Sequence, residues 1–202
     1  MTTCDGRQLT AALGQQSERK QTDFEVFCCT TIQESRFPLV SSVNPVNIRQ
    51  ATEQDIPRLQ ALLRDLHAPH VRALPERFAP RAVGEWDRDL FRGYLSSPSQ
   101  VVLAAERSGE VVGFARAEFR NTSQGVAHLA RTYVEVHEIC IDPAARRSGA
   151  GRLLLEAVKD WAKRQNASSL ELSVYAFNEA ALAFYRRVGL SDMRITLATK
   201  LT

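Results

Sequence analysis

The sequence predicts an α/β domain in which helices pack on a mixed central sheet. Two patterns favour this class: short apolar runs with strand character alternate with amphipathic helical segments, and turns bearing glycine or proline separate them. The length of 202 residues suits one ordinary domain with an extension, but not two full domains. The expected order of elements is β-α-α-β-β-β-α-β-α-β, without an internal repeat.

The first 45 residues differ from the rest and are expected to form an N-terminal extension of unknown role. Residues 14–23 are strongly polar, which is typical of a loop or a disordered segment. Residues 24–32 have the composition of a short strand but lack an obvious hairpin partner. Regular patterning begins near Val46, so the folded domain is predicted over residues 46–202.

The first elements of that domain are a strand and two helices. A short strand over residues 46–49 precedes Thr52, a good N-cap, and apolar residues then recur at helical spacing as far as Leu66. Three prolines in residues 67–83 are expected to interrupt any long helix. Helical spacing returns over residues 86–95.

The middle of the domain is predicted to be three strands. Residues 101–106 and 111–120 flank Ser108-Gly109, which is a good hairpin turn. A third strand, residues 133–141, stops at Asp142-Pro143, since proline cannot donate to a sheet.

The last elements alternate helix and strand. A glycine-bearing turn opens a helix whose apolar face includes Leu154 and Trp161, and a strand over residues 170–175 follows. Asn178 is a good N-cap for the next helix and Gly189 a natural residue to end it. Residues 193–201 are expected to form the final strand.

Composition excludes several classes of protein. With 44% apolar and 24% charged residues the chain is typical of a soluble globular protein, and its net charge of +3 is too small to suggest nucleic acid as a partner. The four cysteines lack the spacing of a zinc site or a disulfide framework. Neither a membrane-spanning run nor a signal peptide is evident, so we expect a cytoplasmic protein with no metal and no membrane partner.

The strongest local signal for chemistry is an arginine- and glycine-rich turn between a strand and a helix. Backbone N–H groups at a helix N-terminus are unpaired, and the helix dipole favours negative charge there. Glycines allow close approach of a phosphate, and arginines add positive charge. The alternative is a turn that merely starts a helix. The turn consists of Arg146, Arg147, Ser148, Gly149, Ala150, Gly151 and Arg152.

Together with the preceding strand and Asp142-Pro143, this turn resembles the acetyl-CoA motif of the GNAT superfamily of N-acetyltransferases. Residues 174–181, with Phe184-Tyr185 and Val188-Gly189-Leu190, are similar to the second cofactor motif of that superfamily. The resemblance covers residues 46–201. It implies a mostly antiparallel sheet that splits to hold the cofactor between the strand ending at Ile141 and the strand starting near Leu170.

The resemblance also implies roles for individual residues. The backbone of residues 147–152 would hold the pyrophosphate of acetyl-CoA, and the main chain of Ile139, Cys140 and Ile141 would pair with the pantetheine arm. Asn178 would contact that arm, with a plain helix cap as the alternative. Tyr185 would protonate the leaving thiolate, with a core tyrosine as the alternative.

A base must accept a proton from the incoming amine, because an alkyl ammonium is mostly charged at neutral pH. Strand alternation places Glu135 and His137 on one face, with Ile139 and Ile141, and Glu138 on the other. Glu135 also lies where histone acetyltransferases of this superfamily carry a glutamate base. We therefore prefer Glu135 with His137. A strand bulge would exchange the faces, which keeps Glu138 as a competitor.

Other reactive side chains carry less weight. Cys140 has no activating base nearby in the sequence, so a buried structural thiol is the preferred interpretation. His67 and His70 fall in the region after the first helix and are interpreted as solvated loop residues, although that region often covers the acceptor in this superfamily.

The sequence leaves the acceptor open. The preferred function is acetyl transfer from acetyl-CoA to a primary amine by direct attack in a ternary complex. The alternatives are acetylation of a protein N-terminus or a lysine, and a module that binds acyl-CoA without catalysis. An aminoglycoside is disfavoured because the acceptor region is not acidic. A homodimer is compatible with the sequence.

Overall fold

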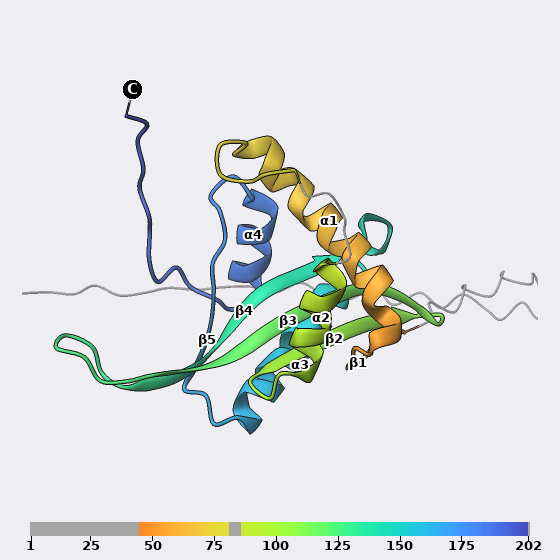
Figure 1. Ribbon diagram of the computed structural model, residues 1–202, viewed down its shortest axis with the longest axis horizontal. Helices are drawn as coiled ribbons and strands as arrows, with labels where there is room; N and C mark the ends of the chain where they lie inside the picture. The colour runs from red at the N-terminus through yellow and green to blue at the C-terminus, as the bar shows by residue number, and fades with distance from the viewer. Residues whose placement is uncertain (1–44, 81–85, 202) are drawn as a thin grey trace, which may run out of the picture. The chain divides into compact units, whose positions relative to one another are not determined.

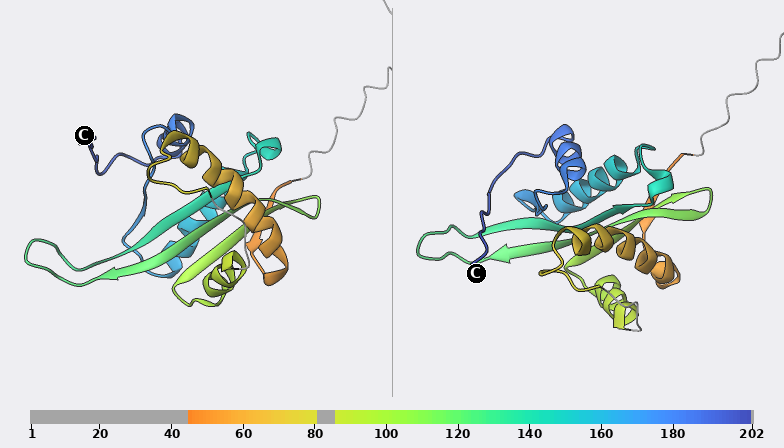
Figure 2. Two further views of the ribbon diagram at one scale, coloured as in Figure 1. Left: turned by 45° about the horizontal axis from the view of Figure 1, so that its top comes forward. Right: turned by 90° about the horizontal axis from the view of Figure 1, so that it is seen from above.

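The computed structural model describes residues 45–80 and 86–201, which belong to one compact unit. A five-stranded sheet lies at the centre, in the order β1-β2-β3-β4-β5. The first four strands pair antiparallel and β4 pairs parallel with β5. Helices α1 and α2 cover one face, and α3 and α4 cover the other (Figures 1 and 2). The predicted mixed α/β sheet is therefore confirmed.

The strands are β1 Asn47–Gln50, β2 Gln100–Arg107, β3 Glu110–Thr122, β4 Arg131–Ile141 and β5 Ser169–Leu172. The helices are α1 Ile56–Ala73, α2 Trp86–Ser96, α3 Ala150–Arg164 and α4 Glu179–Arg187, and two short 3-10 turns are η1 Glu53–Asp55 and η2 Pro143–Ala145. The predicted strand over residues 24–32 lies outside the described residues.

The hairpin between β2 and β3 turns where the sequence predicts. Ser108 and Gly109 both adopt positive φ, at 55° and 83°. Two successive residues in that conformation are typical of the two-residue turn that matches the twist of paired strands.

Asp55 connects the start of α1 to the edge of the sheet. Its carboxylate accepts hydrogen bonds from the Thr52 backbone N–H at 2.7 Å and from the Thr52 hydroxyl at 3.0 Å. The Arg49 guanidinium of β1 donates to both Asp55 oxygens, at 2.8 and 2.9 Å, and to Glu106 of β2 at 2.7 Å. These bonds hold β1, β2 and α1 together.

The prediction that Pro69 would end the first helix is wrong, because α1 continues to Ala73 with Pro69 inside it. Proline removes one backbone N–H, yet packing can compensate a local loss of this kind. The His70 ring nitrogen Nδ1 contacts the Leu66 carbonyl at 2.9 Å, and the rings of His70 and Phe78 meet at 5.3 Å. The last turn of α1 is therefore packed against the chain that follows it.

The predicted final strand is also wrong. Residues 190–201 contain neither helix nor strand, and β5 ends at Leu172 instead of continuing to residue 175. Period-two alternation is necessary for a half-buried strand, but a strand also needs a partner that supplies hydrogen bonds. Within the described residues this segment has no such partner.

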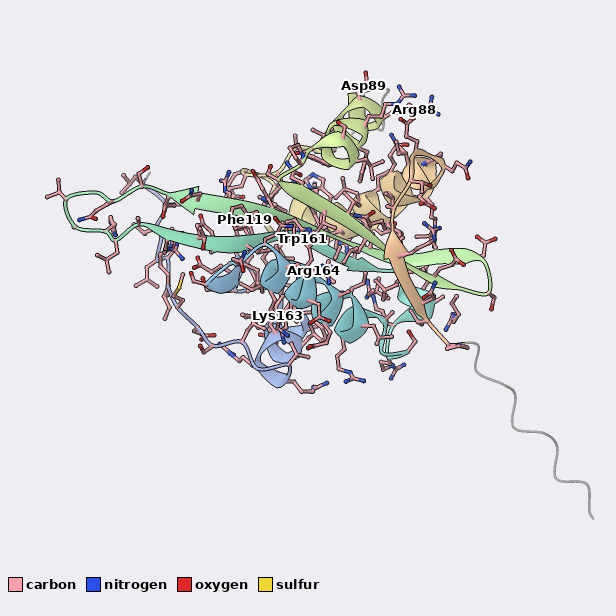
Figure 3. The ribbon with its side chains drawn as sticks, turned by 90° about the horizontal axis from the view of Figure 1, so that it is seen from below. Arg88, Asp89, Phe119, Trp161, Lys163 and Arg164 are labelled. Carbon is pink, nitrogen blue, oxygen red and sulfur yellow. The ribbon has the colours of Figure 1, made fainter. Side chains whose placement is uncertain are left out.

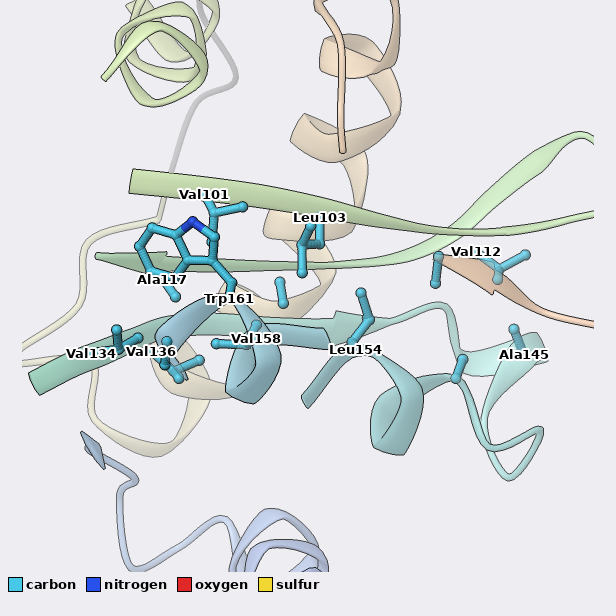
Figure 4. Close-up of a cluster of buried hydrophobic side chains, with 14 residues drawn as sticks. Val101, Leu103, Val112, Ala117, Val134, Val136, Ala145, Leu154, Val158 and Trp161 are labelled. Carbon is cyan, nitrogen blue, oxygen red and sulfur yellow. The ribbon is translucent and has the colours of Figure 1, made fainter. Parts of the chain in front are cut away.

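The core lies on both faces of the sheet. The larger cluster joins β2, β3 and β4 to the inner face of α3, where Leu154, Val158 and Trp161 point toward the strands (Figure 4). Trp161 lies between α3 and the sheet, whereas Lys163 and Arg164 project into solvent (Figure 3). A second cluster packs α1 and α2 on the opposite face.

We predict that Asp55→Asn destabilises the fold in a pH-dependent manner. The Arg49 guanidinium, with the Thr52 donors, lowers the pKa of Asp55 from 3.8 to about 2. A lowered folded-state pKa stabilises the fold above the unfolded pKa, and this stabilisation is lost as pH falls through the folded value. The variant should lose on the order of 1–2 kcal/mol of unfolding free energy at neutral pH.

Urea unfolding measured from neutral pH down to about the folded pKa checks this expectation. Asp89→Asn is the matched control, because Asp89 is exposed on α2 and pairs with Arg92 only at 3.4 Å. The control should change stability by less than roughly 0.5 kcal/mol. A deficit in Asp55→Asn that stays constant down to the lowest pH would contradict the assignment.

Candidate active site

The turn between β4 and α3 is fixed at its beginning by Asp142. The Asp142 carboxylate accepts the Ala144 backbone N–H at 2.8 Å and forms an ion pair with Arg58 of α1. The pKa of Asp142 lies below its ordinary value, first because of the Ala144 donor and then because of Arg58. Ala145 is buried, at 2% exposure, and anchors the turn. Residues 146–149 then lie exposed at the surface.

The N-terminus of α3 is open toward that exposed turn. Gly149 precedes the helix with a φ of 87°, a conformation that favours glycine. Leu153 is the first residue to donate into the helix, to the Gly149 carbonyl at 3.1 Å. The N–H groups of Gly151 and Arg152 donate to no acceptor among the described residues. The helix therefore presents unpaired donors and the positive end of its dipole.

Cationic side chains accompany these donors. Arg146, Arg147 and Arg152 are all exposed around the turn, and the Ser148 hydroxyl lies 3.4 Å from the Ala150 backbone nitrogen. Exposed donors, a helix dipole and three guanidinium groups together favour a phosphate-bearing anion. The predicted anion cradle thus has the expected local geometry.

Gly151 also lies beside side chains that pack against the start of α3. A Cβ at this position would lie 3.5 Å from the Phe184 ring and 3.7 Å from the Ile141 side chain. The side of Gly151 that lacks a Cβ therefore faces the Phe184 ring of α4 and the Ile141 side chain, and its role toward a phosphate stays a prediction. Gly149 is the glycine whose backbone conformation shapes the exposed turn.

The sheet opens beside this turn. Pairing between β4 and β5 runs from Tyr133 with Ser169 to Val136 with Leu172 and then stops. Residues 138–141 of β4 pair with β3 on one side and with no strand of the described chain on the other. The three predicted pantetheine contacts, Ile139, Cys140 and Ile141, lie in this unpaired stretch.

A bulge in β4 interrupts the alternation on which the base assignment depended. Arg116 of β3 pairs with Glu138, but its neighbour Ala117 pairs with Val136, so His137 is an extra residue in β4. A bulge of this kind turns two successive side chains toward the same face. The prediction that Glu138 faces away from Glu135 and His137 is therefore wrong.

Contacts place all three candidates on the face covered by α1 and α2. Glu138 binds Arg116, which stacks on the Tyr94 ring of α2, and His137 and Glu135 contact the neighbouring side chains of β3. Val134, Val136, Ile139 and Ile141 instead join the cluster on the α3 face. The bulge lets apolar side chains on both sides of it reach the same core.

Glu138 is held in a partly buried ion pair. The Arg116 guanidinium donates to its two oxygens at 2.6 and 3.0 Å. Arg116 is itself buried, at 8% exposure, donates to Gln100 at 3.1 Å and lies 4.0 Å from the centre of the Tyr94 ring. Both oxygens of the Glu138 carboxylate are thus engaged as the counter-charge of a buried guanidinium, which is a structural role.

His137 and Glu135 have weaker partners and different surroundings. The His137 Nε2 atom lies 3.0 Å from a Glu118 carboxylate oxygen, and Nδ1 makes no hydrogen bond to another described residue. Glu135 lies 3.3 Å from Arg120, which also contacts Glu118. An imidazole oriented by a carboxylate is a common arrangement for a general base.

Sequence reasoning missed Arg116 and Glu118. Both lie in β3, between apolar residues that are buried on the opposite face. A charged residue at alternate positions of an otherwise apolar strand was the available signal. Its meaning depended on the partner strand, because only the β3–β4 register shows which charges meet.

An aromatic cluster lies at the C-terminal end of α1, and sequence reasoning also missed it. His70 meets the rings of Phe78, Tyr175 and Phe177 at 5.2–5.8 Å, and His67 meets Phe78 at 5.7 Å. The two histidines therefore belong to α1 and to this cluster, not to a solvated loop. Tyr175 and Phe177 remain 39% and 38% exposed, so part of the cluster is available to a ligand.

Helix α4 carries the two remaining predicted residues. The Asn178 side chain accepts the Ala181 backbone N–H at 3.2 Å, which confirms its role as a cap. Tyr185 lies beside Phe184, with ring centres 5.2 Å apart, and burial raises the pKa of its hydroxyl. That hydroxyl makes no hydrogen bond to another described residue. It is therefore protonated at neutral pH and has a free donor.

Cys140 is a buried structural thiol, as the sequence predicts. It is 5% exposed and donates to the Leu62 carbonyl of α1 at 3.0 Å. Burial raises the pKa of the thiol to about 12. A thiolate is the reactive form, so this residue is unsuited to accept an acyl group at neutral pH.

The described residues hold neither a metal-ligand cluster nor a helix suited to a bilayer. No group of three or more histidine, cysteine, aspartate or glutamate side chains in residues 45–80 and 86–201 has the arrangement of a metal site. In the same residues, every helix is too short or too polar to cross a bilayer.

Comparison of the sequence with known proteins identifies relatives. Residues 62–190 match the acetyltransferase (GNAT) family. The N-alpha-acetyltransferase RimI of Mycobacterium tuberculosis is 36% identical over 107 residues, which are 52% of this chain and 60% of that protein. An uncharacterised N-acetyltransferase of Bacillus subtilis, YhfO, is 28% identical over 147 residues, or 73% of this chain and 91% of its own length. The chain thus spans less than two thirds of the mycobacterial relative.

Solved structures share the fold. The tetramutant of the BH1408 protein from Bacillus halodurans superposes with a TM-score of 0.72 at 25% identity, covering 77% of this chain and 99% of that one. The aminoglycoside N-acetyltransferase AAC(6')-Iy in complex with CoA superposes with a TM-score of 0.64 at 18% identity, covering 80% and 99%. At that identity the second likeness concerns the fold alone.

Proposed function

Because the chain belongs to the acetyltransferase (GNAT) family, we propose that it transfers an acetyl group from acetyl-CoA to a primary amine. One observation carries the proposal: the sheet opens after Val136, directly beside a helix N-terminus with unpaired N–H groups. An elongated ligand with an anionic end suits this arrangement, since its arm can lie along β4 and its phosphates can reach α3.

The described residues fit acetyl-CoA as the acyl donor. Arg147 to Arg152 would hold the pyrophosphate through backbone N–H groups, aided by the arginine side chains. The main chain of Ile139 to Ile141 would pair with the pantetheine arm as an added strand does. Asn178 would contact the same arm while it caps α4. Acetyl-CoA supplies an activated thioester, which a neutral amine attacks directly.

His137 is the base that the contacts favour, with Glu118 as the residue that orients it. The Glu118 carboxylate accepts a hydrogen bond from Nε2, so Nδ1 can accept the proton of the amine, directly or through a water. Glu135 lies next to this pair and adds negative charge that attracts an ammonium group. Glu138 is assigned instead to the support of the bulge, through Arg116.

Tyr185 is proposed as the acid. The leaving thiolate needs a proton, and the free Tyr185 hydroxyl keeps its proton because burial raises its pKa. The proton removed from the amine and the proton given to sulfur thus pass through different side chains.

The aromatic cluster favours a peptide N-terminus as a second candidate acceptor. Tyr175 and Phe177 stack with ring centres 5.8 Å apart and stay partly exposed, which suits contact with an apolar side chain near the amine. The mycobacterial relative is named an N-alpha-acetyltransferase, and an Escherichia coli protein that is 36% identical over 83 residues is named a [ribosomal protein bS18]-alanine N-acetyltransferase. That match covers 38% of this chain and 56% of the Escherichia coli protein.

We expect Arg152→Glu to weaken CoA binding by roughly 10-fold or more, because it reverses the charge beside the unpaired N–H groups. Arg164→Glu is the matched control, since it makes the same change at the other end of α3. Calorimetric titration of both variants with CoA measures the difference. Equal affinities of the two variants for CoA would show that the turn at residues 146–152 does not bind CoA.

A screen of acceptors tests the transfer itself. We expect thiol release from acetyl-CoA to rise when a suitable primary amine is added, because the acetyl group then leaves the sulfur. Peptides with free N-termini, the same peptides with blocked N-termini, polyamines and amino acids separate the acceptor classes. Tight CoA binding without thiol release for any class would instead indicate a non-catalytic acyl-CoA-binding module.

The base assignment predicts different defects in two variants. His137→Gln should lower kcat by roughly 10²–10⁴-fold, because it removes the imidazole that accepts the proton of the amine. Glu138→Gln should mainly lower stability, because it leaves the buried Arg116 without its counter-charge. Rates of thiol release across pH, together with urea unfolding, measure both effects. A stable Glu138→Gln variant that has lost its rate, beside an active His137→Gln, would reverse the assignment.

A further inference from the structure

Arg58 joins α1 to the start of the turn between β4 and α3. The helix lies across one face of the sheet, with the turn beside it (Figures 1 and 2). Ile56, Leu59 and Leu62 of α1 are buried in the core on that face, whereas the Arg58 side chain is 38% exposed and lies outside this core. The contacts of Arg58 therefore need an explanation other than core packing.

The Arg58 guanidinium connects parts of the chain that are distant in sequence. Its Nε atom donates to the Val111 carbonyl of β3 at 2.9 Å, and a terminal nitrogen donates to the Asp142 carboxylate after β4. Because one planar group makes both bonds, the direction of the second bond is fixed by the first. Arg58 therefore holds the Asp142 carboxylate in a defined place relative to β3 and α1.

Asp142 passes this fixed position on to the turn. Its backbone N–H donates to the Val112 carbonyl at 2.9 Å, and its carbonyl accepts the Ala145 N–H at 2.8 Å. Its carboxylate accepts the Ala144 N–H at 2.8 Å. Together with the ion pair, these bonds set the direction in which the chain leaves η2.

The rest of the turn has weaker support of its own. The Arg146 backbone N–H and Nε donate to the carbonyls of Pro143 and Ile141, each at 3.4 Å, and the Ser148 hydroxyl accepts the Ala150 N–H at the same length. Hydrogen bonds of that length are weak. The direction of the free N–H groups at the start of α3 therefore depends on how the turn begins.

We propose that Arg58 is a positioning residue for the acyl donor, and that it acts through Asp142 to aim the free N–H groups of Gly151 and Arg152 at the pyrophosphate. The inference rests on the proposed function, which assigns the phosphates of acetyl-CoA to this turn. Donors that are already in place cost less to order when a ligand binds. The ion pair has a second effect, because it neutralises a carboxylate whose charge would otherwise repel the phosphates.

Calorimetric titration with CoA of Arg58→Met, Asp142→Ala and the double variant tests the proposal. Each single variant should raise Kd by roughly 10-fold, and the double variant should stay near that value instead of reaching about 100-fold, because both changes remove one shared support. Arg58→Lys keeps the charge but cannot make both bonds at once, so it should show most of the same loss. Arg64→Met is the matched control at an exposed position of α1, and should change Kd by less than about threefold.

The sign of the Asp142→Ala effect separates positioning from charge alone. If Arg58 served only as a cation near the phosphates, Asp142→Ala would strengthen CoA binding and Arg58→Lys would bind normally, and either result would overturn the proposal. So would effects that multiply in the double variant, because Arg58 would then act on CoA directly.

The binding stoichiometry and urea unfolding of each variant separate positioning from a loss of folded protein. A lower stoichiometry with an unchanged Kd in Arg58→Met would show a merely structural role and overturn the proposal. Normal CoA binding by Arg58→Met beside weakened binding by Arg152→Glu would overturn this inference and leave the proposed function intact. Absence of CoA binding by the unaltered chain would overturn both.

Discussion

The bulge at His137 is the constraint on which the candidate active site depends. One extra residue in β4 changes the alternation between Val136 and Glu138, so that Val136 before it and Ile139 and Ile141 after it reach the α3 core. The same extra residue brings Glu135, His137 and Glu138 to the opposite face. It also falls where β4 loses its parallel partner β5. Core packing, the opening of the sheet and the grouping of polar side chains therefore share one local cause.

The Arg116–Glu138 ion pair supports this bulge from the neighbouring strand. Arg116 is opposite Glu138 in the register and is enclosed by Gln100 and Tyr94. A buried guanidinium requires a counter-charge, so the pair favours the register in which the two meet. Where β4 and β5 are still paired, another ion pair joins them, between Arg131 of β4 and Glu171 of β5. The sheet is thus paired firmly at one end of β4 and open at the other.

The part of β4 beyond Val136, which β5 leaves unpaired, lies between the proposed acyl-donor site and the proposed acceptor site. Toward α3 it presents backbone donors and arginines, which suit a phosphate-bearing acyl donor. Toward α1 it presents His137, Glu118 and the aromatic cluster, which suit an amine with an apolar neighbour. The acyl donor and the acceptor would therefore approach from opposite faces of the sheet. Such an arrangement fits direct attack in a ternary complex better than an acyl-enzyme, because the one cysteine at the split is buried and protonated.

The sequence by itself determined the elements whose signals are local. The Thr52–Asp55 start of α1, the Ser108-Gly109 turn, the cap at Asn178 and the glycine at the end of α4 depend on residues a few positions apart, and all were predicted. The arginine- and glycine-rich turn before α3 was predicted for the same reason. Only the tertiary structure decided the faces of β4, the persistence of α1 beyond Pro69, the part played by Gly151 and the absence of a final strand. The first three depend on residues outside the element itself, namely the register of β3, the ring of Phe78 and the ring of Phe184. The last depends on strand pairing, which residues 190–201 do not make within the described chain.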